Sequence, residues 1–186
     1  MKILIIGASG MIGRILLPEL QKKHEIITAG RNSGDIRVDI SSFASIENLF
    51  KEVKELDAVV CVAGTTFSGP IQNVTNEHLI SGIQNKVLGQ TGLVIVGQHY
   101  LNDGGSFTLT PGKMGELPAP QNTVKALANG AINSFVTAAA MDLERGIRIN
   151  AVSPGLVSII PPQDVLNAYF HSIEGTASGE IIKLGY

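Results

Sequence analysis

Cysteine, charge of one sign and long apolar runs are all scarce in this chain of 186 residues, and each scarcity excludes a class of protein. A single cysteine, Cys61, cannot form an internal disulfide, which fits a reducing compartment and predicts a cytoplasmic protein. The run AVVCVAG surrounds it with apolar residues, so we expect a small buried side chain. The net charge is −2 without a basic block, which argues against a nucleic-acid partner.

The apolar runs are too short for membrane insertion. The opening MKILIIGASG meets a glycine after a few apolar residues, so we expect neither a signal peptide nor a membrane span. The four histidines lie far apart without metal-ligand spacing, and we expect no metal site. Linkers, repeats and low-complexity segments are also missing, so residues 1–186 are predicted to form one domain.

Short β-branched runs alternate with stretches of helical periodicity along the whole chain. The expected strands are 2–7, 25–30, 36–40, 57–64, 106–110, 147–155 and 179–185. The expected helices are 11–24, 41–56, about 76–101, 123–144 and 161–173. Because the strands have unbroken Val/Ile content, both of their faces should be buried. We therefore predict a doubly wound parallel sheet of about seven strands, an α/β/α Rossmann fold.

The motif GASGMIG directly follows the first strand and opens the first helix. A helix N-terminus offers free N–H groups and a positive dipole end, and glycines let the backbone approach a pyrophosphate closely. In this position the motif predicts a dinucleotide site, and a tight strand–helix turn without a ligand is the alternative. The residues expected to bind the cofactor here are Gly7, Ser9, Gly10, Met11, Ile12 and Gly13.

The second strand ends in AGRN, where an NAD-specific site usually carries an acidic residue for the ribose 2′-hydroxyl. Arg31 stands there instead, and a guanidinium pairs well with a 2′-phosphate. Arg31 and its neighbour Asn32 therefore predict NADP(H) in preference to NAD(H). A solvated loop arginine is the alternative interpretation.

At this point the chain resembles the short-chain dehydrogenase/reductase superfamily over nearly its whole length. GASGMIG resembles the family's glycine motif in the spacing of its extended and atypical branches, and GIRINAVSPG is the most distinctive match. The resemblance implies hydride transfer between NAD(P)H and a carbonyl or alcohol, and a homodimer or homotetramer. It also implies further cofactor contacts, from Asp39 and Ile40 at the adenine, from Ala63 and Gly64, and from Pro154 and Gly155 near the nicotinamide.

The chain differs from the family at the positions of the catalytic residues. Members use a tyrosine as acid/base, a lysine four residues later, a serine and an asparagine. Aligned without gaps, these four columns hold Lys125, Asn129, Gly112 and Lys86 here. No tyrosine stands between Tyr100 and Tyr169 to restore the motif by a small shift.

Lys125 and Asn129 lie four residues apart on one helix face, so we expect both to face the cofactor. An unperturbed lysine, with a pKa of about 10.4, is a poor proton shuttle unless burial or a nearby cation such as Lys86 lowers that value. Thr110 provides a nearby hydroxyl, for which a structural role explains the pattern as well as a catalytic role does. Two functions stay open: an atypical NADP(H) oxidoreductase of unknown substrate, and a dinucleotide-binding sensor or regulatory protein without turnover.

The segment after Pro154 and Gly155 passes almost at once into the last helix. Members of the resembled family usually carry a long lid there, which excludes water from the substrate. Its near absence predicts an open site, or one that another chain completes.

Overall fold

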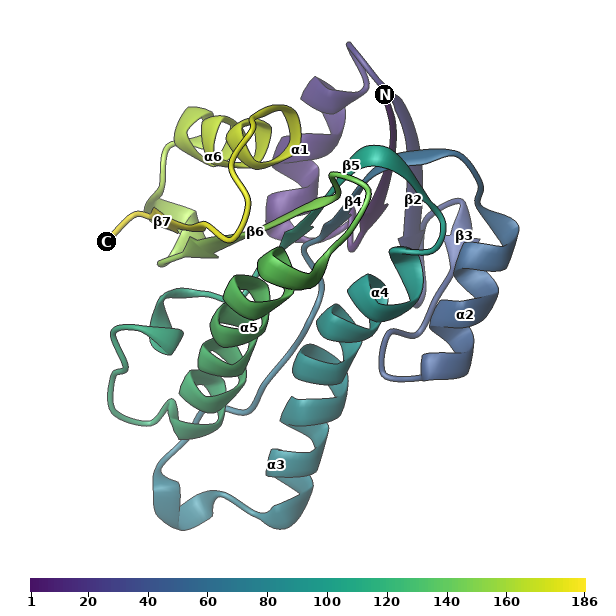
Figure 1. Ribbon diagram of the computed structural model, residues 1–186. Coiled ribbons are helices and arrows are strands. Elements are labelled where there is room, and N and C mark those ends of the chain that lie inside the picture. Colours follow the sequence, from purple (N-terminus) through teal and green to yellow (C-terminus); the bar gives the residue numbers. More distant parts are fainter.

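The computed structural model describes residues 1–186 and shows a sheet of parallel strands between two layers of helices (Figure 1). The strands are β1 (Lys2–Ile6), β2 (Glu25–Gly30), β3 (Ile36–Arg37), β4 (Leu56–Cys61), β5 (Leu101–Leu109), β6 (Arg148–Pro154) and β7 (Ile181–Leu184). Their order across the sheet is β3-β2-β1-β4-β5-β6-β7, and all neighbours pair in parallel. The predicted Rossmann fold is confirmed, while the division into one domain stays a prediction.

Helices cover both faces of this sheet. On one face lie α1 (Met11–Leu20) and α6 (Pro162–Glu174), which pack against each other. On the other lie α2 (Phe43–Glu52), α4 (Gly89–Gly97) and α5 (Thr123–Asp142). A π-helical segment, Ile83–Leu88, joins α3 (Asn76–Gly82) to α4, and Figure 1 shows α3 reaching beyond the sheet beside α5. Successive residues of β1 alternate between the two sides, as a strand buried on both faces requires.

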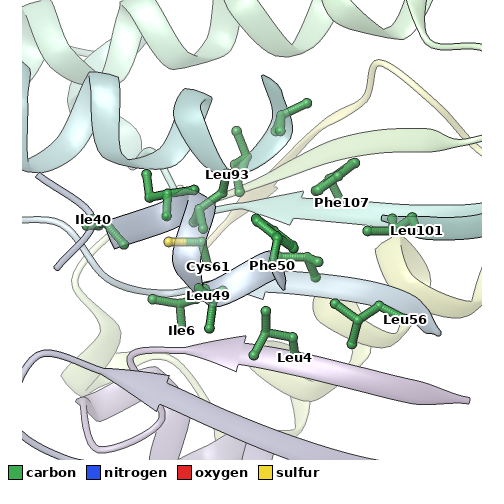
Figure 2. Close-up of a cluster of buried hydrophobic side chains, with 14 of the residues drawn as sticks. Leu4, Ile6, Ile40, Leu49, Phe50, Leu56, Cys61, Leu93, Leu101 and Phe107 are labelled. Atoms are coloured by element: carbon green, nitrogen blue, oxygen red, sulfur yellow. The ribbon is translucent and has the colours of Figure 1, made fainter. Parts of the chain in front are cut away.

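The larger core cluster fills the space between the sheet and α2, α4 and α5. Phe50 and Phe107 lie in it, and Figure 2 shows the Cys61 sulfur among the same side chains. Cys61 is fully buried, which confirms its expected environment. Burial raises the pKa of this thiol to about 11, so it stays neutral and behaves as a small apolar side chain.

Most elements differ from their expected bounds by a few residues, and β5 begins at Leu101, five residues before the expected start at 106. The helix expected to reach Leu101 ends at Gly97, because the chain turns there through a 2.9 Å hydrogen bond from the Tyr100 N–H to the Gly97 carbonyl. The strand expected over 36–40 is only Ile36–Arg37, because the Asp39 N–H turns to the Ser45 hydroxyl instead of a strand neighbour. The expected serine cap at the next helix is present, since the Ser42 hydroxyl accepts from the Ser45 N–H.

None of the helices combines the length and the apolar character needed to cross a bilayer. The cytoplasmic location and the homodimer or homotetramer stay predictions. Leu127 and Met141 on α5 are 51% and 78% exposed, so this helix has an apolar outer side on which the predicted assembly could be built.

Candidate functional site

Two adjoining cavities lie at the carboxyl ends of the strands. The chain leaves β1 toward β2 on one side of the sheet and later returns to β4 on the other, which makes this edge a topological switch point. Ligands of open α/β sheets bind at such points. Gly64 and Thr65 line both cavities, so the two form one continuous groove.

The first cavity has a volume of about 280 Å³ and lies over β1 and β2. Its walls are small and polar, and no carboxylate lines it. The lining residues are Ile6, Gly7, Ser9, Gly30, Arg31, Asn32, Ser33, Val38, Ile40, Ala63, Gly64, Thr65 and Asn85. The structure thus brings seven of the fourteen residues that the sequence assigned to the cofactor into one cavity.

The glycine motif shapes this cavity in two different ways. Gly7 has φ +92°, and an added Cβ would lie 3.0 Å from the Cβ of Ala63, so only glycine fits. Gly13 allows close packing, because a Cβ there would lie 2.5 Å from the backbone of Ala8. Gly10, Met11 and Ile12 form the start of α1 and do not line the cavity with their side chains. Only the backbone N–H groups that they place at the helix N-terminus could take the predicted part in binding.

Gly13→Ala is expected to destabilise the fold by roughly 1–3 kcal/mol, because the new methyl group displaces the Ala8 backbone beside the cavity. The matched control is Gly130→Ala in α5, whose Cβ would meet nothing nearer than 3.6 Å. That control should gain about 0.5–1 kcal/mol from helix propensity. Urea unfolding measures both, and equal effects would contradict the close packing at Gly13.

Arg31 is held at the mouth of the first cavity with part of its guanidinium free. Its Nη2 donates to Asp39 Oδ1 at 2.8 Å and to Asn85 Oδ1 at 3.1 Å, while Nη1 and Nε have no protein partner. The pKa of Asp39 is lowered, first by the Ser41 hydroxyl and also by Arg31. Asp39 itself does not line the cavity, although Ile40 does. Asp39 therefore orients the arginine, and its expected position at the adenine stays a prediction.

The second cavity, of about 360 Å³, lies between the π-helical segment, α5 and the turn after β6. It is lined by Gly64, Thr65, Thr66, Lys86, Pro111, Gly112, Lys113, Met114, Lys125, Asn129, Pro154 and Gly155. Three positions expected at the catalytic centre, Lys86, Lys125 and Asn129, therefore share one cavity. Lys113 and Thr66 were not predicted, because the loops that carry them have no motif.

Lys86 is partly buried and is bonded to the backbone of a neighbouring loop. Its Nζ donates to the Pro111 carbonyl at 2.7 Å. Burial, with a smaller contribution from the positive charge of Lys125, lowers its pKa to about 8. Our expectation concerned the effect of Lys86 on Lys125, and the structure shows the charge of Lys125 acting on Lys86. This pKa is close to neutral pH, where an amine can both donate and accept a proton efficiently.

Asn129 is 2% exposed, and its Oδ1 has no hydrogen-bond partner. Gly112, at φ +136°, leaves room for the amide, because a Cβ at residue 112 would lie 3.1 Å from Asn129 Nδ2. A buried amide oxygen without a donor costs roughly 1–3 kcal/mol. A ligand hydroxyl in the second cavity, such as that of a ribose, would supply the missing donor.

The structure does not bring Thr110 to either cavity. Its hydroxyl lies 2.7 Å from the Tyr169 hydroxyl in the core, and its N–H donates to Gln90 Oε1. Burial raises the pKa of Tyr169, so this phenol stays protonated. Another phenol, that of Tyr186, lies nearer the groove. Lys113 Nζ is 5.4 Å from the centroid of the Tyr186 ring, and the Tyr186 hydroxyl bonds to the Ser153 hydroxyl.

Comparison with known proteins fits this geometry. A family model described as enoyl-(acyl carrier protein) reductase matches residues 15–170, most of the chain. The chain belongs to the short-chain dehydrogenase/reductase superfamily. The protein lin1944 from Listeria innocua shares 40% identity over the whole of both chains, with a TM-score of 0.94. A small-chain dehydrogenase crystallised in complex with NADPH shares 25% identity, with 98% of this chain and 95% of that chain covered and a TM-score of 0.89.

The curated relatives of this short-chain dehydrogenase/reductase are longer. Short-chain dehydrogenase/reductase ATR9 of Stachybotrys chlorohalonatus is 32% identical over 152 residues, which cover 73% of this chain and 57% of the relative. The uncharacterized oxidoreductase YmfI of Bacillus subtilis is 30% identical, with 69% and 54% covered. The chain therefore spans little more than half the length of these relatives.

The short segment after β6 leaves the groove open. Residues 155–161 connect β6 to α6 through a single 3₁₀ turn, Val157–Ile159. Leu156 and Ile159 in this connection are 65% and 76% exposed. The segment is as short as the sequence predicts. Completion of the site by another chain stays a prediction.

Proposed function

We propose that this short-chain dehydrogenase/reductase is an atypical NADP(H)-dependent oxidoreductase acting on a carbonyl or alcohol, with a lysine replacing the family's tyrosine. The observation that carries the proposal is the second cavity, where Lys86 has a pKa of about 8 beside the dinucleotide groove. A general acid works best when its pKa lies near the working pH. The alternative, a dinucleotide-binding protein without turnover, does not require such a group.

The residues of the groove fit a dinucleotide. Gly7 provides the close backbone approach, and Asn129 Oδ1 needs a hydroxyl donor. The free Nη1 and Nε of Arg31, in a cavity without carboxylates, favour the 2′-phosphate of NADP(H) over NAD(H). The relative crystallised with NADPH supports the same choice.

When bound, NADPH would supply a hydride to a carbonyl carbon. Lys86, as an ammonium, holds the proton that the carbonyl oxygen must gain and releases it from Nζ as the O–H bond forms. The neutral amine then regains a proton from water, which the pKa of about 8 permits near neutral pH. Lys125 contributes a second positive charge to the cavity, which helps to lower the pKa of Lys86 and so eases the release of its proton.

The test combines binding with turnover. NADPH is titrated into the protein by calorimetry, and oxidation is then followed by the loss of absorbance of the reduced cofactor with quinones, aldehydes and ketones. Binding with oxidation supports the proposal. Binding without oxidation of any carbonyl supports the alternative, and the absence of binding to folded protein overturns both.

Cofactor preference is tested at Arg31. Arg31→Asp should weaken NADPH binding about 10- to 100-fold, the value of a hydrogen-bonded charge pair, and leave NADH binding nearly unchanged. The matched control is Arg37→Asp, which makes the same charge change outside the groove. Calorimetry with both cofactors measures the two affinities. Equal losses of affinity for NADPH and NADH would show that Arg31 does not bind the 2′-phosphate.

A further inference from the structure

The second cavity concentrates positive charge in a chain whose net charge is −2. Lys86, Lys113 and Lys125 line it, and no aspartate or glutamate does. None of the three forms an ion pair. The carboxylate of the adjoining loop, Glu116, is already paired with Lys183. The protein itself therefore supplies no counter-charge to this cavity.

This arrangement is costly without a ligand. The hydrogen bond from Lys86 Nζ to the Pro111 carbonyl satisfies one of its three donors. Burial and the nearby charge of Lys125 both disfavour the protonated amine. Like charges that are partly removed from water repel each other more strongly than at a surface. An anion between them would reverse that repulsion.

A second, independent observation points to a ligand in the same place. Asn129 lines the cavity, is 2% exposed and has an amide oxygen without a hydrogen-bond partner. Its Nδ2 lies at the space left by the missing side chain of Gly112. The amide oxygen is therefore fixed by packing and free to accept a hydrogen bond from a ligand hydroxyl, while an anionic group in the cavity would be bound by the lysines.

We infer that the second cavity takes a substrate bearing an anionic group, a carboxylate or phosphate, in addition to its reacting carbonyl or alcohol. Lys125 and Lys113 bind the anion, and Lys86 is left to the reacting oxygen. The inference rests on the proposed function and narrows its substrate to oxo acids, hydroxy acids or their phosphorylated counterparts. Neutral quinones and ketones would bind less well, because they leave the lysines without a counter-charge.

The experiment compares charged molecules with uncharged partners on NADPH-saturated protein. The pairs are 2-oxobutanoate, 3-oxobutanoate and 4-oxopentanoate with their methyl esters, and dihydroxyacetone phosphate with dihydroxyacetone. Binding is measured by calorimetry and NADPH oxidation is measured separately. At least one anion should bind about 10- to 100-fold more tightly than its partner, and salt should reduce the difference. The pair that responds distinguishes a carboxylate from a phosphate.

Variants assign the effect to the cavity. Lys125→Gln should remove most of the advantage of the anion without changing NADPH affinity, whereas Lys54→Gln, at an exposed lysine, should keep the advantage. Thermal unfolding confirms that both variants fold. Equal affinity within every pair overturns the inference, as does a Lys125→Gln variant that loses NADPH affinity and keeps the advantage of the anion. Anion binding without NADPH oxidation upholds this inference and contradicts the proposed function. NADPH oxidation by uncharged carbonyls alone contradicts this inference and upholds the proposed function.

Discussion

Lys86→Met is expected to lower kcat/KM for carbonyl reduction about 100- to 10,000-fold, the usual contribution of a positioned general acid. The variant keeps the length and apolar part of the side chain and removes the proton at Nζ. NADPH affinity should change little, because the first cavity is built by other residues. Steady-state kinetics and calorimetry on the same preparation separate the two quantities.

The pH profile gives an independent check on this role. With Lys86 as the acid, kcat/KM for reduction should be level below a pH of about 8 and fall tenfold per pH unit above it. Tyr186→Phe is the control, because it keeps the ring against Lys113 and removes only a hydroxyl that bonds to Ser153, and it should keep both rate and profile. A Lys125→Met variant that loses activity while Lys86→Met keeps it would assign the acid to Lys125 instead.

The same lysine should make stability depend on pH. The folded pKa of about 8 lies below the ordinary value of 10.5, so between these values the unfolded chain holds a proton that the folded chain has released. Stability then rises with pH across this window, and the full cost of the buried charge is present below a pH of about 8. Lys86→Met should therefore be more stable than the unmodified protein at pH 7, by at most about 3 kcal/mol, with the difference vanishing near pH 10.5.

Urea unfolding of both proteins across pH 7 to about 10.5 measures this difference, and titrations common to the two cancel. Lys51→Met is the matched control, since Lys51 is exposed on α2 and its replacement should stay within about 0.5 kcal/mol at every pH. A constant difference for Lys86→Met across the range would show that its amine is not desolvated in the folded protein.

Local sequence patterns were sufficient to predict most of the fold. After Lys2 and Asp57 the residues of β1 and β4 are apolar without interruption, and burial on both faces favours a parallel sheet between helices. The glycine motif likewise marks its own position, because strand, turn and helix are consecutive in the chain. The order of the strands was not predicted, and the structure supplies it together with the switch point at which the cavities lie.

Contacts between distant segments could not be read in the same way. Alternation along β5 shows that Thr108 and Thr110 share a face, but it does not say that this face meets α6 and Tyr169 and points away from the groove. The pairing of Arg31 with Asn85 joins residues 54 positions apart. The depressed pKa of Lys86 depends on burial, which sequence alone does not reveal for a lysine between Asn85 and Val87.

The π-helical segment connects residues that line the groove with a helix that packs in the interior of the protein. Asn85 and Lys86 are adjacent in it, yet one lines the first cavity and the other the second. Beyond it, Gly89 and Gly97 leave room for Ile40 and Phe50, with no space for a Cβ. Deleting or inserting one residue here would rotate the following helix by about 100° and bring larger side chains against those two residues. Evolution can therefore change the ligand preference of this wall by substitution, but a change of length would disrupt the buried interior.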